Sequence, residues 1–213
     1  MFKYDSKFGR FMTKIFDLIM LNVLFLLMSI PIITIGANLA ALYAVFLQMI
    51  DKNESPVLKM YLKHFKENFR QATTAWLIVL SIIVVLILDL FVISELDGLR
   101  RIVVYATVIF LILAVVYSLF IFPMIYKFKN TIWEQSKNVL LLMMGYFPWV
   151  LILLVINLGP LMAVYKWLPN AYGLLIYFYL FIGSALTLYL NAFIFNRIFN
   201  HLIGLKSESL LKT

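Results

Sequence analysis

Four polar side chains lie inside long apolar runs of this sequence, at positions where a charge or an amide could do chemistry. They are Asn22, Asp89, Asn157 and Asn191. Asp89 is the only carboxylate deep in an apolar run, and such groups commonly belong to proton or substrate pathways. The alternative is that it reaches water near Ser94, about a turn further on. The isolated asparagines could mark a polar pathway, but hydrogen bonds between helices are their more common role.

A second candidate is a turn within the apolar run from Ile15 to Ile50. Its marked residues are Pro31, Thr34, Gly36 and Asn38. The proline lacks a backbone donor, and the glycine permits dihedrals that other residues resist. Backbone groups freed at membrane depth need protein or water partners, which the threonine and the asparagine could supply. The functional interpretation is a broken-helix site beside a cavity, as in transporters. The structural interpretation, a hairpin turn, is the one we favour.

Motifs for enzyme chemistry are absent from the sequence. It contains no phosphate-binding loop, dinucleotide fingerprint, nucleophile elbow or zinc-protease motif, and no pair of clustered carboxylates. Cysteine is absent, and the two histidines, His64 and His201, are far apart in sequence. That is poor material for thiolate chemistry or for a histidine metal site. We therefore expect no enzyme activity, no metal and no cofactor.

The composition indicates the environment in which these residues work. The chain has 213 residues, of which 64% are hydrophobic, and its mean hydropathy is +1.00. Soluble domains average about 45–50% apolar residues, so this chain has more than one globular core can bury. The net charge is +8. Its basic residues gather at the ends of apolar runs, which favours contact with membrane lipid and argues against nucleic-acid binding.

The apolar runs predict an all-α, multi-pass membrane protein with one domain over residues 1–213. Its six expected segments are 15–33, 36–50, 72–93, 102–125, 139–164 and 171–195. A polar tail is expected over 196–213. Each segment suits a membrane helix, although 36–50 is slightly short.

A basic amphipathic helix is expected over residues 55–70. Ser55 is a good N-cap, and Pro56 suits the first helical position. One face carries Val57, Met60, Tyr61, His64, Phe65 and Asn68. The other side carries the candidate contacts to a protein partner or to anionic lipid, Lys59, Lys63, Lys66 and Arg70.

The positive-inside rule selects the topology. If the run from 15 to 50 reverses at its turn, 15 of the 18 basic residues fall on the cytoplasmic side. A single span there would place the basic residues of 51–71 outside. We therefore predict a helical bundle of three hairpins with both termini cytoplasmic. Whether the first hairpin crosses the whole bilayer stays open.

Two stretches carry a resemblance to a known family. The sequence from Lys7 to Val45 resembles the start of the YesL family, bacterial membrane proteins of unknown function common in Gram-positive bacteria. The second stretch is the sequence YLKHFKENFRQATTAW over residues 61–76. The residues of the first stretch that carry the resemblance are Asn22, Ile30, Pro31, Thr34, Gly36, Ala37, Ala41, Leu42 and Tyr43.

The resemblance implies a setting and no catalytic residues. Genes of this family tend to lie beside those of carbohydrate ABC importers. The expected function is an accessory role at such an importer in the bacterial cytoplasmic membrane, with its permease subunits as partners. The alternatives are a small solute transporter or channel and, more weakly supported, a factor in cell-envelope polymer assembly. The solute, the partner and the oligomeric state stay open.

Overall fold

The computed structural model describes residues 7–51, 56–92, 100–167 and 171–211. Every regular element within these ranges is helical, and none is a strand. Within these described ranges, six helices are long and apolar enough to cross a membrane by length and composition. The expected all-α, multi-pass architecture is confirmed.

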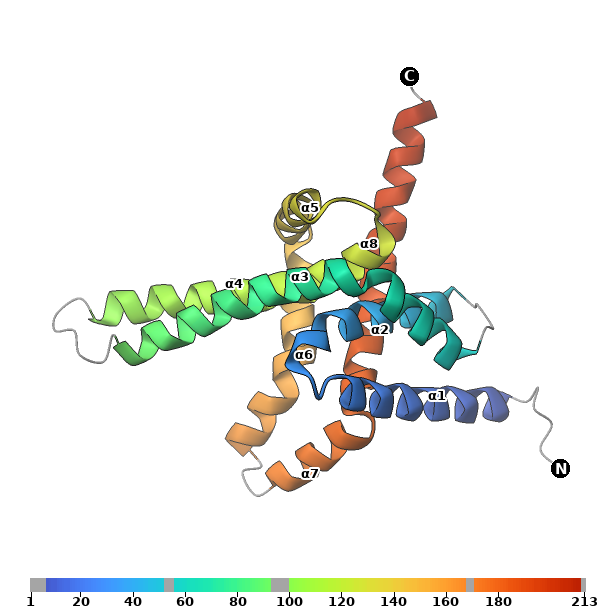
Figure 1. Cartoon of the computed structure of the whole chain (residues 1–213), viewed down its shortest axis with the longest axis horizontal. Helices are drawn as coiled ribbons and strands as arrows, with labels where there is room; N and C mark the ends of the chain where they lie inside the picture. Colours follow the sequence, from blue (N-terminus) through green and yellow to red (C-terminus); the bar gives the residue numbers. More distant parts are fainter. Residues whose placement is uncertain (1–6, 52–55, 93–99, 168–170, 212–213) are drawn as a thin grey trace.

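The long apolar run near the N-terminus forms two helices. Helix α1 covers Lys7–Met28, the short helix η1 covers Ile32–Thr34, and α2 covers Ile35–Ile50. Figure 1 shows α1 and α2 running in opposite directions, which confirms the predicted reversal. The 16 residues of α2 make a helix about 24 Å long. That is shorter than the hydrocarbon core of about 30 Å.

Helix α2 is the centre of the molecule. It packs against α1, α3, α4 and α8, and every residue from Gly36 to Leu47 except Leu39 is buried. Ala37, Ala40, Ala41 and Ala44 are fully buried. Small side chains let helices approach closely, and close packing is a main source of stability between membrane helices. The shortest candidate span is therefore also the most enclosed.

The second hairpin differs in one respect from the prediction. The amphipathic stretch 55–70 and the span 72–93 form one continuous helix, α3, over the 36 residues Val57–Val92. The junction contains neither proline nor glycine, so nothing in the sequence ends the helix there. Helix α4, Arg100–Lys127, packs along α3, and Figure 1 shows the pair as a long arm.

The expected segment 139–164 is wrong at its beginning. Helix α5 covers Ile132–Gly145 and α6 covers Phe147–Trp167, with a break at Tyr146. Helix α5 begins at a capping box. The Thr131 hydroxyl oxygen accepts from the Glu134 backbone amide at 3.3 Å, and the Thr131 backbone amide donates to the Glu134 side-chain carboxylate at 3.1 Å. Its 14 residues reach about 21 Å, too short to span the hydrocarbon core.

The last expected segment, 171–195, is also interrupted. It consists of α7, Tyr172–Phe178, a π-helical turn, η4, over Tyr179–Gly183, and α8, Ser184–Leu211. The expected polar tail over 196–213 continues α8 as a helix up to Leu211. No proline or glycine before Gly204 stops α8, which explains its length.

The third hairpin, α6 with α7 and α8, runs across the direction of α3 and α4 (Figure 1). Helices that cross in this way span one bilayer only with tilt, which is usual for membrane helices. An aromatic cluster joins α8 of the third hairpin to α2 and α4. Phe195 meets Tyr43 edge-on with ring centroids 5.7 Å apart and Phe120 at 5.0 Å. Helices α2, α4 and α8 thus share one core.

Candidate functional site

The residues of the predicted turn hold the first hairpin together. Thr34 Oγ1 donates to the Pro31 carbonyl oxygen at 2.7 Å and also contacts the Met28 carbonyl oxygen. Trp76 Nε1, on α3, donates to the Ile32 carbonyl oxygen at 2.8 Å. Of these carbonyl oxygens, that of Met28 lies at the end of α1, where a helix leaves its last carbonyl groups without helical partners. The turn is therefore closed by its own threonine and by a neighbouring helix.

Asn38 joins three helices from the first turn of α2. Its side chain is fully buried, and its Nδ2 donates to Ser29 Oγ at 2.9 Å and to the Phe25 carbonyl oxygen at 3.4 Å. Its Oδ1 accepts from the Tyr61 hydroxyl on α3. Both ends of this amide are thus paired with protein, which is the role expected for a structural residue.

Gly36 allows α2 and α3 to touch. A Cβ at this position would overlap the Ala72 carbonyl oxygen and the Trp76 Cβ. Both atoms belong to the α3 helix, so neither can move away as a flexible side-chain end would. The geometry at Gly36, Thr34 and Asn38 supports the structural interpretation of the turn.

Asn22 binds the interruption in the last span. Its Nδ2 donates to the carbonyl oxygens of Tyr179 at 3.1 Å and Leu180 at 2.8 Å, and its Oδ1 accepts from the Ala185 amide at 2.9 Å. A π-helical turn disturbs the regular backbone pairing of a helix. In a membrane those backbone groups need internal partners, and Asn22 supplies them from α1.

The other two isolated asparagines, Asn157 and Asn191, lie against each other. Each Nδ2 donates to the other's Oδ1, at 3.2 and 3.3 Å, which ties α6 to α8. Asn191 Nδ2 also reaches the Tyr43 hydroxyl of α2 at 3.4 Å. The three asparagines therefore do not form one cluster: Asn22 of α1 hydrogen-bonds to η4, and the other two form an amide pair.

A cavity of about 360 Å³ lies beside the amide pair and the π-helical turn. Its polar side chains are those of Asn157, Tyr179, Ser184 and Thr187. Its other walls are the apolar side chains Phe25, Leu39, Leu161 and Leu188. Sequence reasoning missed Ser184 and Thr187, because isolated serines and threonines are common in membrane helices. This cavity is the feature closest to the broken-helix site described for transporters.

Asp89 accepts a hydrogen bond from Thr107 Oγ1 at 2.8 Å across the α3–α4 hairpin. Thr107 is buried, with 4% of its surface exposed. Asp89 lies on α3 and Thr107 on α4, so this hydrogen bond lies within the long arm that these two helices form. The structure therefore gives it a partner within its own hairpin.

The basic face of α3 is exposed, as the amphipathic pattern predicts. Lys59, Lys63, Lys66 and Arg70 are all exposed, while Val57, Met60, Tyr61 and His64 are buried. Sequence reasoning missed Gln48, whose Nε2 contacts His64 Nε2 at 2.7 Å and the Tyr126 hydroxyl at 3.0 Å. The available signal was a lone amide near the end of an apolar run.

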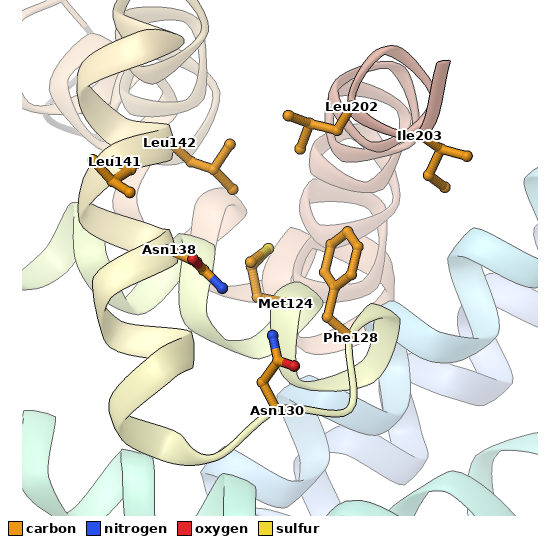
Figure 2. Close-up of a pocket in the computed structure, with 8 residues that line it drawn as sticks. All are labelled: Met124, Phe128, Asn130, Asn138, Leu141, Leu142, Leu202 and Ile203. Atoms are coloured by element: carbon orange, nitrogen blue, oxygen red, sulfur yellow. The ribbon is translucent and has the colours of Figure 1, made fainter. Parts of the chain in front are cut away.

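A second cavity, of about 330 Å³, lies between the end of α4, α5 and α8. Figure 2 shows Leu141 and Leu142 of α5 across from Leu202 and Ile203 of α8. Met124, Phe128, Asn130 and Asn138 complete its lining. Six of these eight side chains are apolar, and the amides of Asn130 and Asn138 are its polar side chains.

Groups of three or more histidine, cysteine, aspartate or glutamate side chains suited to hold a metal ion do not occur in the described ranges. The candidate site residues of the described spans that the structure pairs are the amides of Asn22, Asn157 and Asn191 and the carboxylate of Asp89. Such groups can bridge helices or line a solute cavity.

Comparison with known proteins identifies a family for the first part of the chain. Residues 18–90 match the model of a family described as "Protein of unknown function, DUF624", the family that YesL proteins belong to. The resemblance expected from the sequence is confirmed over that range, which runs from α1 through the turn and α2 into α3. No curated protein and no solved structure matches this chain.

Proposed function

We propose that this DUF624 protein is an accessory protein of a carbohydrate ABC importer, without enzyme activity of its own. It would bind the importer's permease subunits, or assist their assembly, in the cytoplasmic membrane of a Gram-positive bacterium. The single observation that carries the proposal is how the buried amides are used. Asn22, Asn38 and Asn191 are fully buried, and all three hydrogen-bond to other helices.

The outer surface of the protein supports a role in assembly. Its core amides hold helices together, so the groups left for a partner lie outside the core. The basic face of α3 is exposed along about three turns, between Lys59 and Arg70. That face lies on the side predicted to be cytoplasmic. The carbohydrate importer itself is suggested by the gene neighbourhood that the YesL resemblance implies.

Co-purification from the native membrane in mild detergent tests this proposal. The wild-type chain should recover permease subunits. The double variant Lys59→Gln and Lys66→Gln should recover fewer, because it removes two charges from the exposed face. The matched control, Arg101→Gln with Lys166→Gln, removes two charges from the side predicted to be external and should recover as much as the wild type. Recovery of the wild-type chain alone, with sugar uptake unchanged on deletion, would contradict the proposal.

A transport function of the chain itself is the second candidate. The observation that favours it is the cavity beside η4, where Ser184 and Thr187 line a space next to an interrupted helix. Purified protein in liposomes should then move a small polar solute. Thr187→Val keeps the side-chain shape and removes the hydroxyl, so it should slow that flux. Flux that is absent from wild-type liposomes, or unchanged in the variant, would count against this candidate.

A further inference from the structure

A polar cleft of about 610 Å³ lies between the first half of α3 and the end of α4. It brings cations from two elements together, Lys63 on α3 and Lys129 just after α4. The lining residues are Lys63, His64, Glu67, Asn68, Gln71, Ile125, Tyr126, Lys129 and Asn130. Gln71 closes one side, because its Nε2 donates to the Asn130 carbonyl oxygen at 2.7 Å. We call this space the α3–α4 cleft.

The floor of the α3–α4 cleft is built around His64, of which only 7% is exposed. An amide nitrogen can only donate, so His64 Nε2 accepts from Gln48 Nε2 at 2.7 Å. The proton of the neutral ring is then on Nδ1, which donates to Glu67 Oε2 at 3.0 Å. The Tyr126 ring packs edge-on against the imidazole at 5.3 Å. These contacts fix both the orientation and the tautomer of His64.

The same contacts leave donors for a ligand. The Tyr126 hydroxyl accepts from Gln48 Nε2 at 3.0 Å, so its own proton can be donated elsewhere. In the described part of the chain, Lys129 has no carboxylate within ion-pair distance. Lys63 lies 4.0 Å from Glu67 in an exposed pair, and such pairs are weak. Glu67 is the one carboxylate of the cleft and already faces His64 and Lys63.

We propose that the α3–α4 cleft binds a phosphate group, carried either by the headgroup of an anionic lipid or by a small phosphorylated solute. Two lysines and a phenolic hydroxyl suit phosphate oxygens, which accept charge-assisted hydrogen bonds. The position also fits. The cleft lies where α3 passes from its basic first half to the apolar stretch that begins at Ala72, the level at which lipid headgroups are found. This assignment does not depend on an importer.

Native mass spectrometry of the full chain in detergent tests the assignment with two lipids, dioleoyl phosphatidylglycerol and dioleoyl phosphatidylcholine. The wild type should bind phosphatidylglycerol more tightly. Lys63→Gln with Lys129→Gln should raise the Kd for phosphatidylglycerol about tenfold or more, since each lysine supplies a charge-assisted contact. The matched control, Lys127→Gln with Lys137→Gln, removes two nearby charges outside the cleft and should leave the Kd within about twofold of wild type.

A third variant separates the site from general surface charge. Tyr126→Phe keeps the ring against His64 and removes the hydroxyl, so it should weaken phosphatidylglycerol binding without changing the net charge. Competition then identifies the source of the phosphate. If inorganic phosphate or glycerol 3-phosphate displaces the lipid at millimolar concentration, the cleft takes a soluble ligand; if neither does, it takes the lipid. Equal affinity for both lipids with no binding of inorganic phosphate or glycerol 3-phosphate, or equal losses in the two double variants, would overturn the proposal.

Discussion

At the scale of single residues, buried amides in this protein act as substitutes for missing backbone partners. Asn22 shows this most clearly, because one side chain serves two carbonyl oxygens and one amide of the last span. Asn38 adds a second donor to the Phe25 carbonyl oxygen of α1 and accepts from the Tyr61 hydroxyl of α3. An asparagine suits this task because it carries a donor and an acceptor on one short side chain.

Replacing Asn22 with leucine should destabilise the protein. The change keeps a similar volume but leaves the Tyr179 and Leu180 carbonyl oxygens and the Ala185 amide without their side-chain partner. We expect a loss of about 1–3 kcal/mol in the free energy of unfolding, measured by thermal unfolding in detergent. The same change at exposed Asn200 should have little effect. An unchanged melting temperature for Asn22→Leu would show that the contacts to η4 contribute nothing.

Gly36→Ala should also destabilise the protein, for a steric reason. The added methyl group would overlap the backbone of α3 at Ala72, and the two helices would have to move apart. We expect a cost of about 1–3 kcal/mol by the same thermal measurement. Gly159→Ala is the matched control, because its Cβ would lie 3.7 Å from Val155 Cγ1, an ordinary contact. Equal melting temperatures for the two variants would contradict the close approach.

At the scale of helices, the interruptions decide how the third hairpin is built. The break at Tyr146 separates the short helix α5 from the spanning helix α6, and the Tyr146 hydroxyl contacts His201 Nδ1 of α8 at 2.7 Å. Further along, Asn157 and Asn191 join α6 to α8. Helix α6 is therefore attached through a few polar contacts rather than through a broad buried face.

A double-mutant cycle on Asn157 and Asn191 should measure that attachment. Each single change to alanine removes the reciprocal amide bonds, so the double variant should cost less than the sum of the two. The coupling energy should be about 0.6 kcal/mol, and at most about 1.7 kcal/mol, as for hydrogen bonds between other membrane helices. It would be read from unfolding of purified protein. Strict additivity would show that the pair does not act as a unit.

At the scale of the whole molecule, three hairpins that do not share one direction pack around a central helix that is almost completely buried. Helix α2 contacts all three hairpins, and most of its length is buried. The α3–α4 arm extends away from α6 and α8, as Figure 1 shows. Much of the arm's surface is apolar and exposed, including Val85, Phe91 and Ile109. Such a surface requires lipid or another membrane protein around it.

Cysteine labelling in intact cells should establish the orientation of this assembly. The chain has no cysteine of its own, so a single introduced thiol is the only target. Ile33→Cys, at an exposed position of the first turn, should react with a membrane-impermeant reagent if the turn faces outward. Lys59→Cys should react only after the cells are opened. The opposite pattern would reverse the predicted topology.

The sequence by itself determined the properties that depend on neighbouring residues. Hydropathy located the apolar runs, and the charge distribution required a reversal within the first of them. The spacing of Val57, Met60, Tyr61 and His64 placed them on one face, and that face is buried. The motif with Pro31, Thr34, Gly36 and Asn38 marked the turn, because local backbone geometry depends strongly on residue type.

Only the tertiary structure decided which distant residues meet. Asn22 and Ala185 are 163 positions apart in sequence, and no local pattern connects them. Beneath the α3–α4 cleft, Gln48 of α2 contacts His64 of α3 and Tyr126 of α4, and no local pattern connects these three residues. The direction of the third hairpin likewise depends on packing against α2. Hydropathy shows that a helix is apolar, but the shapes of the facing side chains decide where it packs.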